Sequence, residues 1–302
     1  MSDPLAPQHL FGHVEDAPDF HLPVFLAPEG SHGHVAIPQP FLQETPLYES
    51  KTGSELIDRT ILPLELKITK FMVLEVAVAL IVLVLFVVLA KGLRGAGTVR
   101  GRLWNLLEVF LLFIRDEVAR PCIGKHDADR FVPFLWTMFL FVLGCNLMGM
   151  IPWMGSPTGA LATTGALAII TFLVVIGSGM KQLGVVGFWK AQVPHMDLPG
   201  AIAPVIKVFI FVIEIFGLIV KHAVLAVRLL ANMMAGHVVL AVIIAFIGAS
   251  ATAGAAVWGG VTFASVLGAT ALSMLELFVA FLQAYIFTFL SALFIGAAVH
   301  PH

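Results

Sequence analysis

The chain has 302 residues, of which 59% are hydrophobic and only 12% are charged, and its mean hydropathy is +0.97. Soluble domains usually carry about 25% charged residues, so this composition excludes an ordinary soluble protein and indicates an integral membrane protein. The net charge of −2 gives no sign of a nucleic-acid-binding surface. The two cysteines, Cys122 and Cys145, have neither disulfide nor metal-site spacing and are expected to be reduced thiols.

Residues 1–66 form a polar segment that is rich in proline, histidine and acidic side chains. The segment lacks the apolar core of a secretory signal. We expect it to be extracytoplasmic and mostly loop, with a short helix near 53–60. A solvated tail is the favoured interpretation of its histidines, with metal binding as the alternative for four of them: His9, His13, His32 and His34.

Residues 67–302 are predicted to form the membrane domain, in which each crossing of the hydrocarbon core takes about 20 helical residues. Five apolar stretches meet this length, and we predict spans at about 68–90, 131–151, 160–180, 203–247 and 262–298. A further helix at about 101–120 is predicted to lie in the membrane interface, because its apolar side chains recur at helical spacing between charged ends. Glycines and prolines break 181–200 too often for a span, and 248–261 is expected to be a link.

The last two predicted spans are unusually long. A helix of about 45 residues measures about 67 Å, more than twice the apolar thickness of a bilayer of about 30 Å. An ordinary tilt of about 20° cannot absorb that excess, so each helix either lies very obliquely or contains a break. The predicted fold class is therefore an all-α polytopic membrane protein with about five crossings, the last two long, strongly tilted and antiparallel.

Lysine and arginine are concentrated in the links at 91–130 and 181–200, whereas the links at 152–159 and 248–261 contain neither. Basic residues favour the cytoplasmic side, so the N-terminus is predicted outside and the C-terminus in the cytoplasm. In this orientation Glu75 lies near the outer end of the first span, where we expect snorkelling or a contact with a neighbouring helix.

Arg228 lies within the apolar stretch 203–247, where an ionised side chain costs at least a few kcal/mol. Arginine cannot lose its proton to escape that cost, so its presence there indicates a function. At 100° per residue, Glu214, Lys221, Arg228 and Asn232 fall within about 40° of one another. This polar line is expected to face a water-filled cavity or a protein partner rather than lipid.

The final span repeats the pattern, since Glu276 and Gln283 are seven residues apart and lie on one helical face. In an antiparallel pair we expect His237 beside Glu276, and Asn232 with Arg228 at the level of Gln283. One alternative is that Glu276 neutralises Arg228 in a buried structural ion pair. The predicted depths differ by about one and a half to two turns, which instead favours a carboxylate from another subunit as the partner of Arg228.

These same residues carry a resemblance to a known family. The motif RLLANMMAGH (228–237), preceded by EIFGLIVK (214–221) and followed by LELFVAFLQAYIF (275–287), resembles subunit a of the F-type ATP synthase. NLMGMIP (146–152) fits the same family, and the resemblance covers about 68–298. It implies a non-catalytic, proton-translocating stator subunit without a cofactor or metal. The neighbours that it implies are a rotating ring of c subunits and the b-subunit peripheral stalk, in the bacterial inner membrane.

By this resemblance, Arg228 matches the family's essential arginine, which the carboxylates of the c-subunit ring pass in turn while it blocks proton leak. Asn232 and Gln283 match its polar neighbours in the middle of the membrane. The resemblance thus assigns the coupling of proton flow to ring rotation to this part of the chain.

The resemblance also implies two offset half-channels for protons. His237 and Glu276 match positions where relatives hold an acid and a histidine in either arrangement in the outer half-channel, and Asn146 is placed near its entrance. Glu214 and Lys221 match residues of the inner half-channel.

Three positions depart from the family pattern, and they put the lining of the inner exit in question: His222, where many relatives have proline, Val224 and Gly149. The alternative function is a stand-alone ion-coupled secondary transporter or channel. That alternative predicts inverted repeats and a central substrate site, and the sequence has no evident internal repeat.

Overall fold

A computed structural model describes residues 16–21, 34–39, 68–96, 101–151, 154–193 and 203–300. Within these residues, five helices are long and apolar enough to cross a membrane: α3 (Lys70–Ala96), α6 (Ala128–Gly149), α7 (Leu161–Leu183), α9 (Ala203–Ala249) and α10 (Ala255–Val299). The prediction of an all-helical membrane protein with five spans is confirmed.

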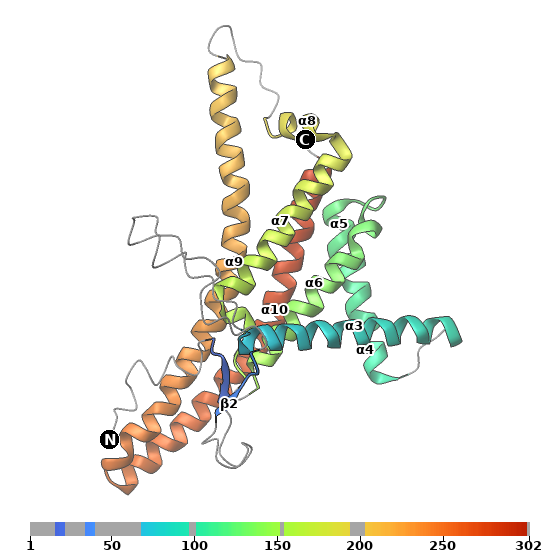
Figure 1. Cartoon of the computed structure of the whole chain (residues 1–302). Helices are drawn as coiled ribbons and strands as arrows, with labels where there is room; N and C mark the ends of the chain where they lie inside the picture. The colour runs from blue at the N-terminus through green and yellow to red at the C-terminus, as the bar shows by residue number, and fades with distance from the viewer. Residues whose placement is uncertain are drawn as a thin grey trace.

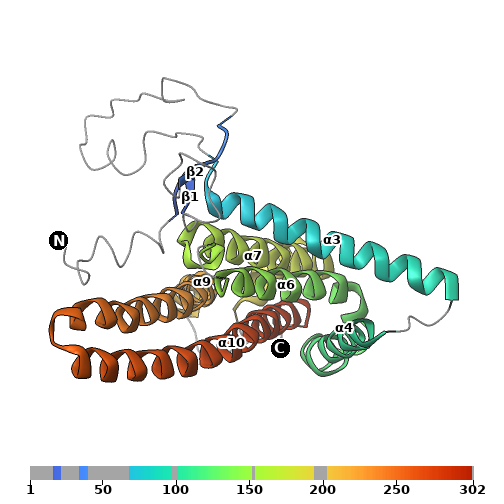
Figure 2. The same cartoon turned by 90° about the horizontal axis from the view of Figure 1, so that it is seen from below.

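The two long helices α9 and α10 are continuous over 47 and 45 residues, so the predicted alternative of a break in each is wrong. They pack against each other and extend as a hairpin beyond the other helices (Figures 1 and 2). At 1.5 Å per residue each is about 70 Å long, so neither fits upright in a bilayer core. The short connection between them contains only the 3₁₀ turn η4 (Ser250–Thr252) and two further residues.

Helix α10 begins at Ala255, whereas the sequence predicted a link as far as residue 261. Gly259 and Gly260 lie inside the helix. Glycine is more frequent in membrane helices than in soluble ones, and the neighbouring alanines are strong helix formers. The glycine-based prediction of a loop therefore ended the link too late.

The predicted interfacial segment consists of α4 (Arg102–Phe113), the π-helical turn η1 (Ile114–Ala119) and α5 (Arg120–Ile123). Its second half does not lie only on a surface, because Ile114, Val118 and Ala119 are completely buried. The π-turn packs against α6 and α10. The segment is thus part of the helical bundle as well as a candidate interfacial helix.

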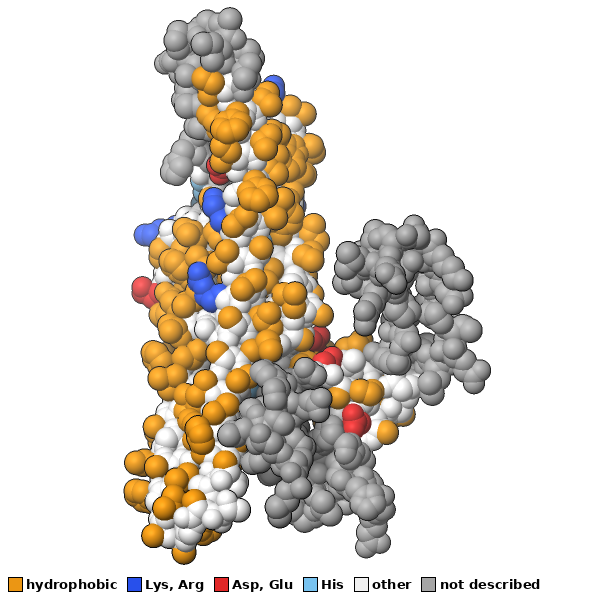
Figure 3. Space-filling model, turned by 90° about the vertical axis from the view of Figure 1, so that its left-hand side faces the viewer, with side chains coloured by type: hydrophobic (Ala, Val, Ile, Leu, Met, Phe, Trp, Pro, Cys, Tyr) orange, Lys and Arg blue, Asp and Glu red, His pale blue; other side chains and the backbone are white. Residues whose placement is uncertain are grey.

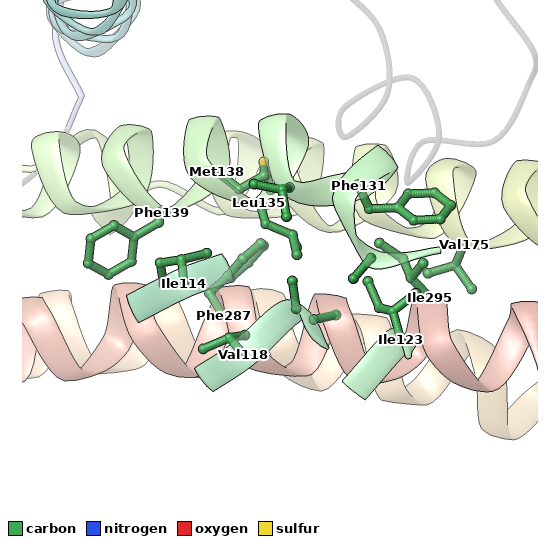
Figure 4. Close-up of a cluster of buried hydrophobic side chains, with 14 of the residues drawn as sticks. Ile114, Val118, Ile123, Phe131, Leu135, Met138, Phe139, Val175, Phe287 and Ile295 are labelled. Atoms are coloured by element: carbon green, nitrogen blue, oxygen red, sulfur yellow. The ribbon is translucent and has the colours of Figure 1, made fainter. Parts of the chain in front are cut away.

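The buried centre of the molecule lies where α6, α10 and the π-turn meet. Figure 4 shows Leu135 and Phe139 of α6, Phe287 of α10, and Ile114 and Val118 of η1 around this centre. All five side chains are at most 3% exposed. Because lipid is as apolar as these side chains, their close packing rather than a hydrophobic driving force holds the helices together.

The N-terminal segment contains two short antiparallel strands, β1 (Asp19–His21) and β2 (His34–Ala36). The sequence had predicted loop there, and a strand pair this short gives little periodicity to detect. The helix predicted near 53–60 lies outside the described residues, as do His9, His13 and His32.

The remaining elements are the 3₁₀ turn η2 (Pro157–Gly159), which precedes α7, and α8 (Val185–Ala191), which follows it. The segment 181–200 was predicted only as too broken to cross the membrane. Its first half forms α8, which has seven residues and packs against α7.

Gly296 marks a close approach between α10 and α5, and replacing it by alanine is expected to destabilise the fold. A Cβ atom there would lie 2.0 Å from the carbonyl oxygen of Cys122. Because that atom belongs to the backbone, the two helices would have to separate, at a cost of about 1–3 kcal/mol. The thermal unfolding midpoint of the purified protein in detergent measures the loss.

Gly268→Ala is the matched control on the same helix, since nothing lies within 4 Å of a Cβ atom at Gly268. It is expected to be neutral or slightly stabilising, because alanine is the better helix former. Equal unfolding midpoints for the two variants would contradict the close contact at Gly296.

Candidate functional site

Two polar pairs connect α9 to α10 at different levels. Asn232 donates a hydrogen bond from Nδ2 to Oε1 of Gln283 over 2.7 Å. Further along, Nδ1 of His237 lies 2.9 Å from Oε1 of Glu276. Both contacts were predicted from helical spacing in an antiparallel pair, and both are confirmed.

The His237–Glu276 pair is largely shielded, with side chains 12% and 7% exposed. The two groups are within ion-pairing distance, but their geometry is not that of a hydrogen bond. Oε1 of Glu276 has no hydrogen-bond partner in the described part of the chain. Nε2 of His237 is also unpartnered there. Shielded acid and base groups with free hydrogen-bonding capacity are suited to receiving and passing protons.

Gly236 lies next to the carboxylate of Glu276. A Cβ atom at residue 236 would lie 2.7 Å from Oε1 of Glu276, closer than such atoms pack. A side chain at residue 236 would therefore displace the carboxylate at the flexible end of Glu276 from its present position.

Arg228 is exposed on the surface of α9. Its guanidinium has neither an ion pair nor a hydrogen bond with any described residue. Glu276 is paired with His237 instead, so the alternative of a structural Arg228–Glu276 ion pair is wrong. Asn232, one turn further along, is exposed on the same face.

Glu214 and Lys221 lie at the other end of the polar line. Nζ of Lys221 is 3.8 Å from Oε1 of Glu214, and the two side chains are about half exposed. An ion pair this open contributes little to stability. Both residues line a cavity of about 290 Å³ between α7, α8, α9 and α10.

The helices are tightly packed between these two polar regions. Leu225 and Leu229 of α9 and Ala284 and Phe287 of α10 are at most 1% exposed. Along α9, Lys221 and His237 are separated by about 24 Å at 1.5 Å per residue. Between the two polar regions the helix pair thus contains tightly packed apolar side chains together with the Asn232–Gln283 hydrogen bond.

Asn146 joins α6 to α10 through a buried hydrogen-bond network. Its Nδ2 donates to the carbonyl oxygen of Ala280, 3.2 Å away and one turn from Glu276. Thr158 donates to Oδ1 of Asn146 over 2.7 Å, and the hydroxyls of Thr158 and Ser156 are 2.8 Å apart. Asn146 therefore lies beside the Glu276 segment of α10.

Sequence reasoning missed Ser156 and Thr158, because they belong to the turn before α7 and have no helical register. Their signal is a pair of hydroxyl residues in an otherwise apolar region shortly after NLMGMIP. Gly149 allows this turn to pack, since a Cβ atom there would lie 2.4 Å from Cβ of Ser156.

Glu75 contacts a neighbouring helix, which is one of the two alternatives expected from the sequence. Oγ1 of Thr163 on α7 donates to Oε1 of Glu75 on α3 over 2.5 Å. Thr163 is buried and was not singled out in the sequence. This bond connects α3 to α7 near the N-terminal end of the first span.

His222 faces the interior of the bundle and not the polar line. Its Nδ1 lies 2.9 Å from the carbonyl oxygen of Leu218, and its ring packs between Phe172 of α7 and Phe294 of α10. The departure from the family pattern at this position therefore places an imidazole behind the cavity that Glu214 and Lys221 line, on another face of α9.

Together these features define a polytopic helical membrane protein with titratable groups at two separated levels of one long helix pair. The family model for the ATP synthase A chain matches residues 72–296, and the chain belongs to this family. Subunit a of the ATP synthase of Myxococcus xanthus is 41% identical over 245 residues, which cover 79% of this chain and 76% of that protein.

Other relatives carry the same name. Subunit a from Anaeromyxobacter dehalogenans is 44% identical over 202 residues, covering 66% of this chain and 50% of that protein. Subunit a from Chloroherpeton thalassium is 43% identical over 195 residues, covering 65% of this chain and 55% of that protein. The chain thus spans about half the length of these two relatives.

Membership of this family makes the chain the non-catalytic, proton-translocating subunit of the membrane part of ATP synthase. It assembles within the F-type complex and is a multi-pass membrane protein with bacterial relatives. The alternative class, a stand-alone transporter or channel, is replaced by this assignment.

Proposed function

We propose that the chain provides two offset proton half-channels, and that Arg228 between them couples proton flow to the rotation of a ring of c subunits. The observation that carries the proposal is the exposed guanidinium of Arg228, which no carboxylate of the described residues neutralises. A charge in the membrane needs a partner. In this proposal the partner is a carboxylate that each ring subunit presents in turn.

The outer half-channel is proposed to run past Asn146, His237 and Glu276. The shielded His237–Glu276 contact supports this path, and so does the Asn146 network one turn away on α10. A proton passed inward from this pair neutralises a ring carboxylate. The carboxyl group, now uncharged, can face lipid at far lower cost than an ion could.

The inner half-channel is proposed to run past Glu214 and Lys221. Support comes from the cavity of about 290 Å³ that both residues line, and from their half-exposed ion pair. After nearly a full turn of the ring, a carboxyl group meets Arg228 and releases its proton toward this cavity. Asn232 and Gln283 hold the polar middle of the helix pair through their hydrogen bond.

The positive charge of Arg228 repels protons and so blocks direct leak between the half-channels. Each charge that crosses 100 mV supplies about 2.3 kcal/mol, so several protons must pass for each ATP made elsewhere in the complex. The proposed surroundings are the c-subunit ring, the b-subunit peripheral stalk and the bacterial inner membrane, with the N-terminus outside and the C-terminus in the cytoplasm.

Thiol labelling from each side of the membrane tests the two half-channels. Glu214→Cys is expected to react with an impermeant maleimide only from the cytoplasmic side, and His237→Cys only from the outside. Vesicles of both orientations, containing the whole complex, give the two measurements. Both native thiols are removed in the background variant, Cys122→Ser with Cys145→Ala, so that only the introduced cysteine can react.

Leu229→Cys is the control, because this residue is fully buried between the two levels. It is expected to react from neither side. Labelling of any one position from both sides would indicate a continuous pore and would overturn the proposal of two separate half-channels.

A further inference from the structure

A shallow hydrophobic groove lies between α8 and the first turns of α9, away from the proton path. Its apolar wall consists of six side chains: Val185, Val186, Trp189, Val193, Val208 and Phe211. The groove has a volume of about 470 Å³. The rings of Trp189 and Phe211 meet edge to face, with centroids 6.3 Å apart and an interplanar angle of 75°.

Two lysines complete this groove, which we call the lipid groove. Lys190 of α8 and Lys207 of α9 both line it, and both are exposed. No carboxylate of residues 68–96, 101–151, 154–193 or 203–300 forms an ion pair with either ammonium group. The nearest acid along α9, Glu214, is already within reach of Lys221.

The groove is separate from the inner cavity, although α8 borders both. Phe188, Ala191 and Gln192 face the cavity with Glu214 and Lys221, whereas Trp189 and Lys190 face the groove. The site therefore does not depend on the proposed proton path.

We propose that this groove binds an anionic phospholipid, with an acyl chain against the apolar wall and the phosphate on Lys190 and Lys207. An apolar wall next to unpaired positive charges complements a molecule that carries both a hydrocarbon chain and a negative headgroup. Basic pockets at the cytoplasmic ends of membrane helices bind such headgroups. Trp189 suits the same position, because tryptophan favours the membrane–water interface.

The chemistry also favours a lipid over a soluble phosphate. The groove lies beside α8, which follows the C-terminal end of α7 after Gly184. The orientation predicted from the basic residues places that end at the cytoplasmic surface, where phospholipid headgroups lie. A small inorganic anion would contact the lysines but would leave the apolar wall unoccupied. A phospholipid fills both parts.

Quenching of Trp189 fluorescence by brominated lipids tests the proposal. The full-length chain is reconstituted in phosphatidylcholine bilayers, and part of the lipid is replaced by phosphatidylglycerol or phosphatidylcholine brominated on one acyl chain. The Trp189 signal is the difference between the unmodified chain and Trp189→Phe. Brominated phosphatidylglycerol is expected to quench this signal at a lower mole fraction than brominated phosphatidylcholine.

Lys190→Gln and Lys207→Gln are each expected to reduce this preference about fivefold, the equivalent of about 1 kcal/mol for one basic residue near the surface. Lys190→Arg keeps the charge and is expected to keep the preference. Lys181→Gln is the matched control, because Lys181 lies in the last turn of α7, just before α8, but does not line the groove.

Equal quenching by the two lipids, or equal effects of the Lys190, Lys207 and Lys181 replacements, would refute the lipid site. Loss of quenching on addition of inorganic phosphate would also refute it, by identifying a soluble anion as the ligand. Quenching by brominated phosphatidylcholine checks that α8 is still in place in each variant. If a glutamine variant fails that check, the comparison of lipids on the unmodified chain and on Lys190→Arg decides.

Discussion

Arg228→Ala is expected to lower proton-driven ATP synthesis about a hundredfold or more, the size of loss that follows removal of a positioned electrostatic group. Without the guanidinium, a ring carboxylate has no cation to draw it into the charged form, and protons are no longer repelled from the gap between the half-channels. The measurement is the rate of ATP synthesis by the purified complex in vesicles with an imposed proton gradient.

Lys221→Ala is the matched comparison on the same polar line. Its ammonium is about half exposed and lies 3.8 Å from Glu214. Lys221→Ala is therefore expected to lower the rate of ATP synthesis severalfold less than Arg228→Ala does. Arg228→Lys keeps a positive charge but loses the planar fork of donors that holds a carboxylate, and an intermediate rate is expected. Synthesis at the unmodified rate in Arg228→Ala vesicles would overturn the mechanism.

The helix pair could be predicted closely from the sequence because α9 and α10 are uninterrupted. A continuous antiparallel pair keeps one register along its whole length, so a correct relative level predicts every facing pair. That is why counting residues placed Asn232 beside Gln283 and His237 beside Glu276, as the structure has them.

Elements without such a register were not predictable in the same way. The turn that carries Ser156 and Thr158 is placed by its packing on Gly149 and by hydrogen bonds to Asn146. Neither contact leaves a periodic pattern in the sequence. The π-turn over Ile114–Ala119 is a similar case, because its register follows from packing against α6 and α10.

The lipid groove could not be predicted from the spacing of residues in the sequence. Trp189 and Lys190 come from a seven-residue helix inside a segment that glycine and proline interrupt. Lys207 belongs to the first turns of a different helix. Only the fold brings these side chains to one groove, whereas the residues of the polar line share a single helix and were visible from spacing alone.

Changes at the His237–Glu276 pair are also expected to have a large effect on ATP synthesis. Glu276→Gln is expected to lower ATP synthesis about a hundredfold, since removing a positioned proton-transfer group typically costs about 10²–10⁴. The amide cannot take up and release a proton, which leaves His237 without its acidic partner. His237→Glu alone is also expected to be impaired, because it puts two carboxylates in contact in a shielded place, where like charges disfavour ionisation.

The double variant, His237→Glu with Glu276→His, is expected to recover much of the lost rate. Nδ1 of His237 and Oε1 of Glu276 face each other from two helices at 2.9 Å, so the exchange preserves one acid and one imidazole at the same level. The glycine at residue 236 adds no side chain beside residue 276 in the exchanged pair. Synthesis rates in vesicles for the two single variants and the double variant form a complete cycle. A double variant no faster than Glu276→Gln would show that the direction of the pair matters, and would contradict a path in which the two groups act as a unit.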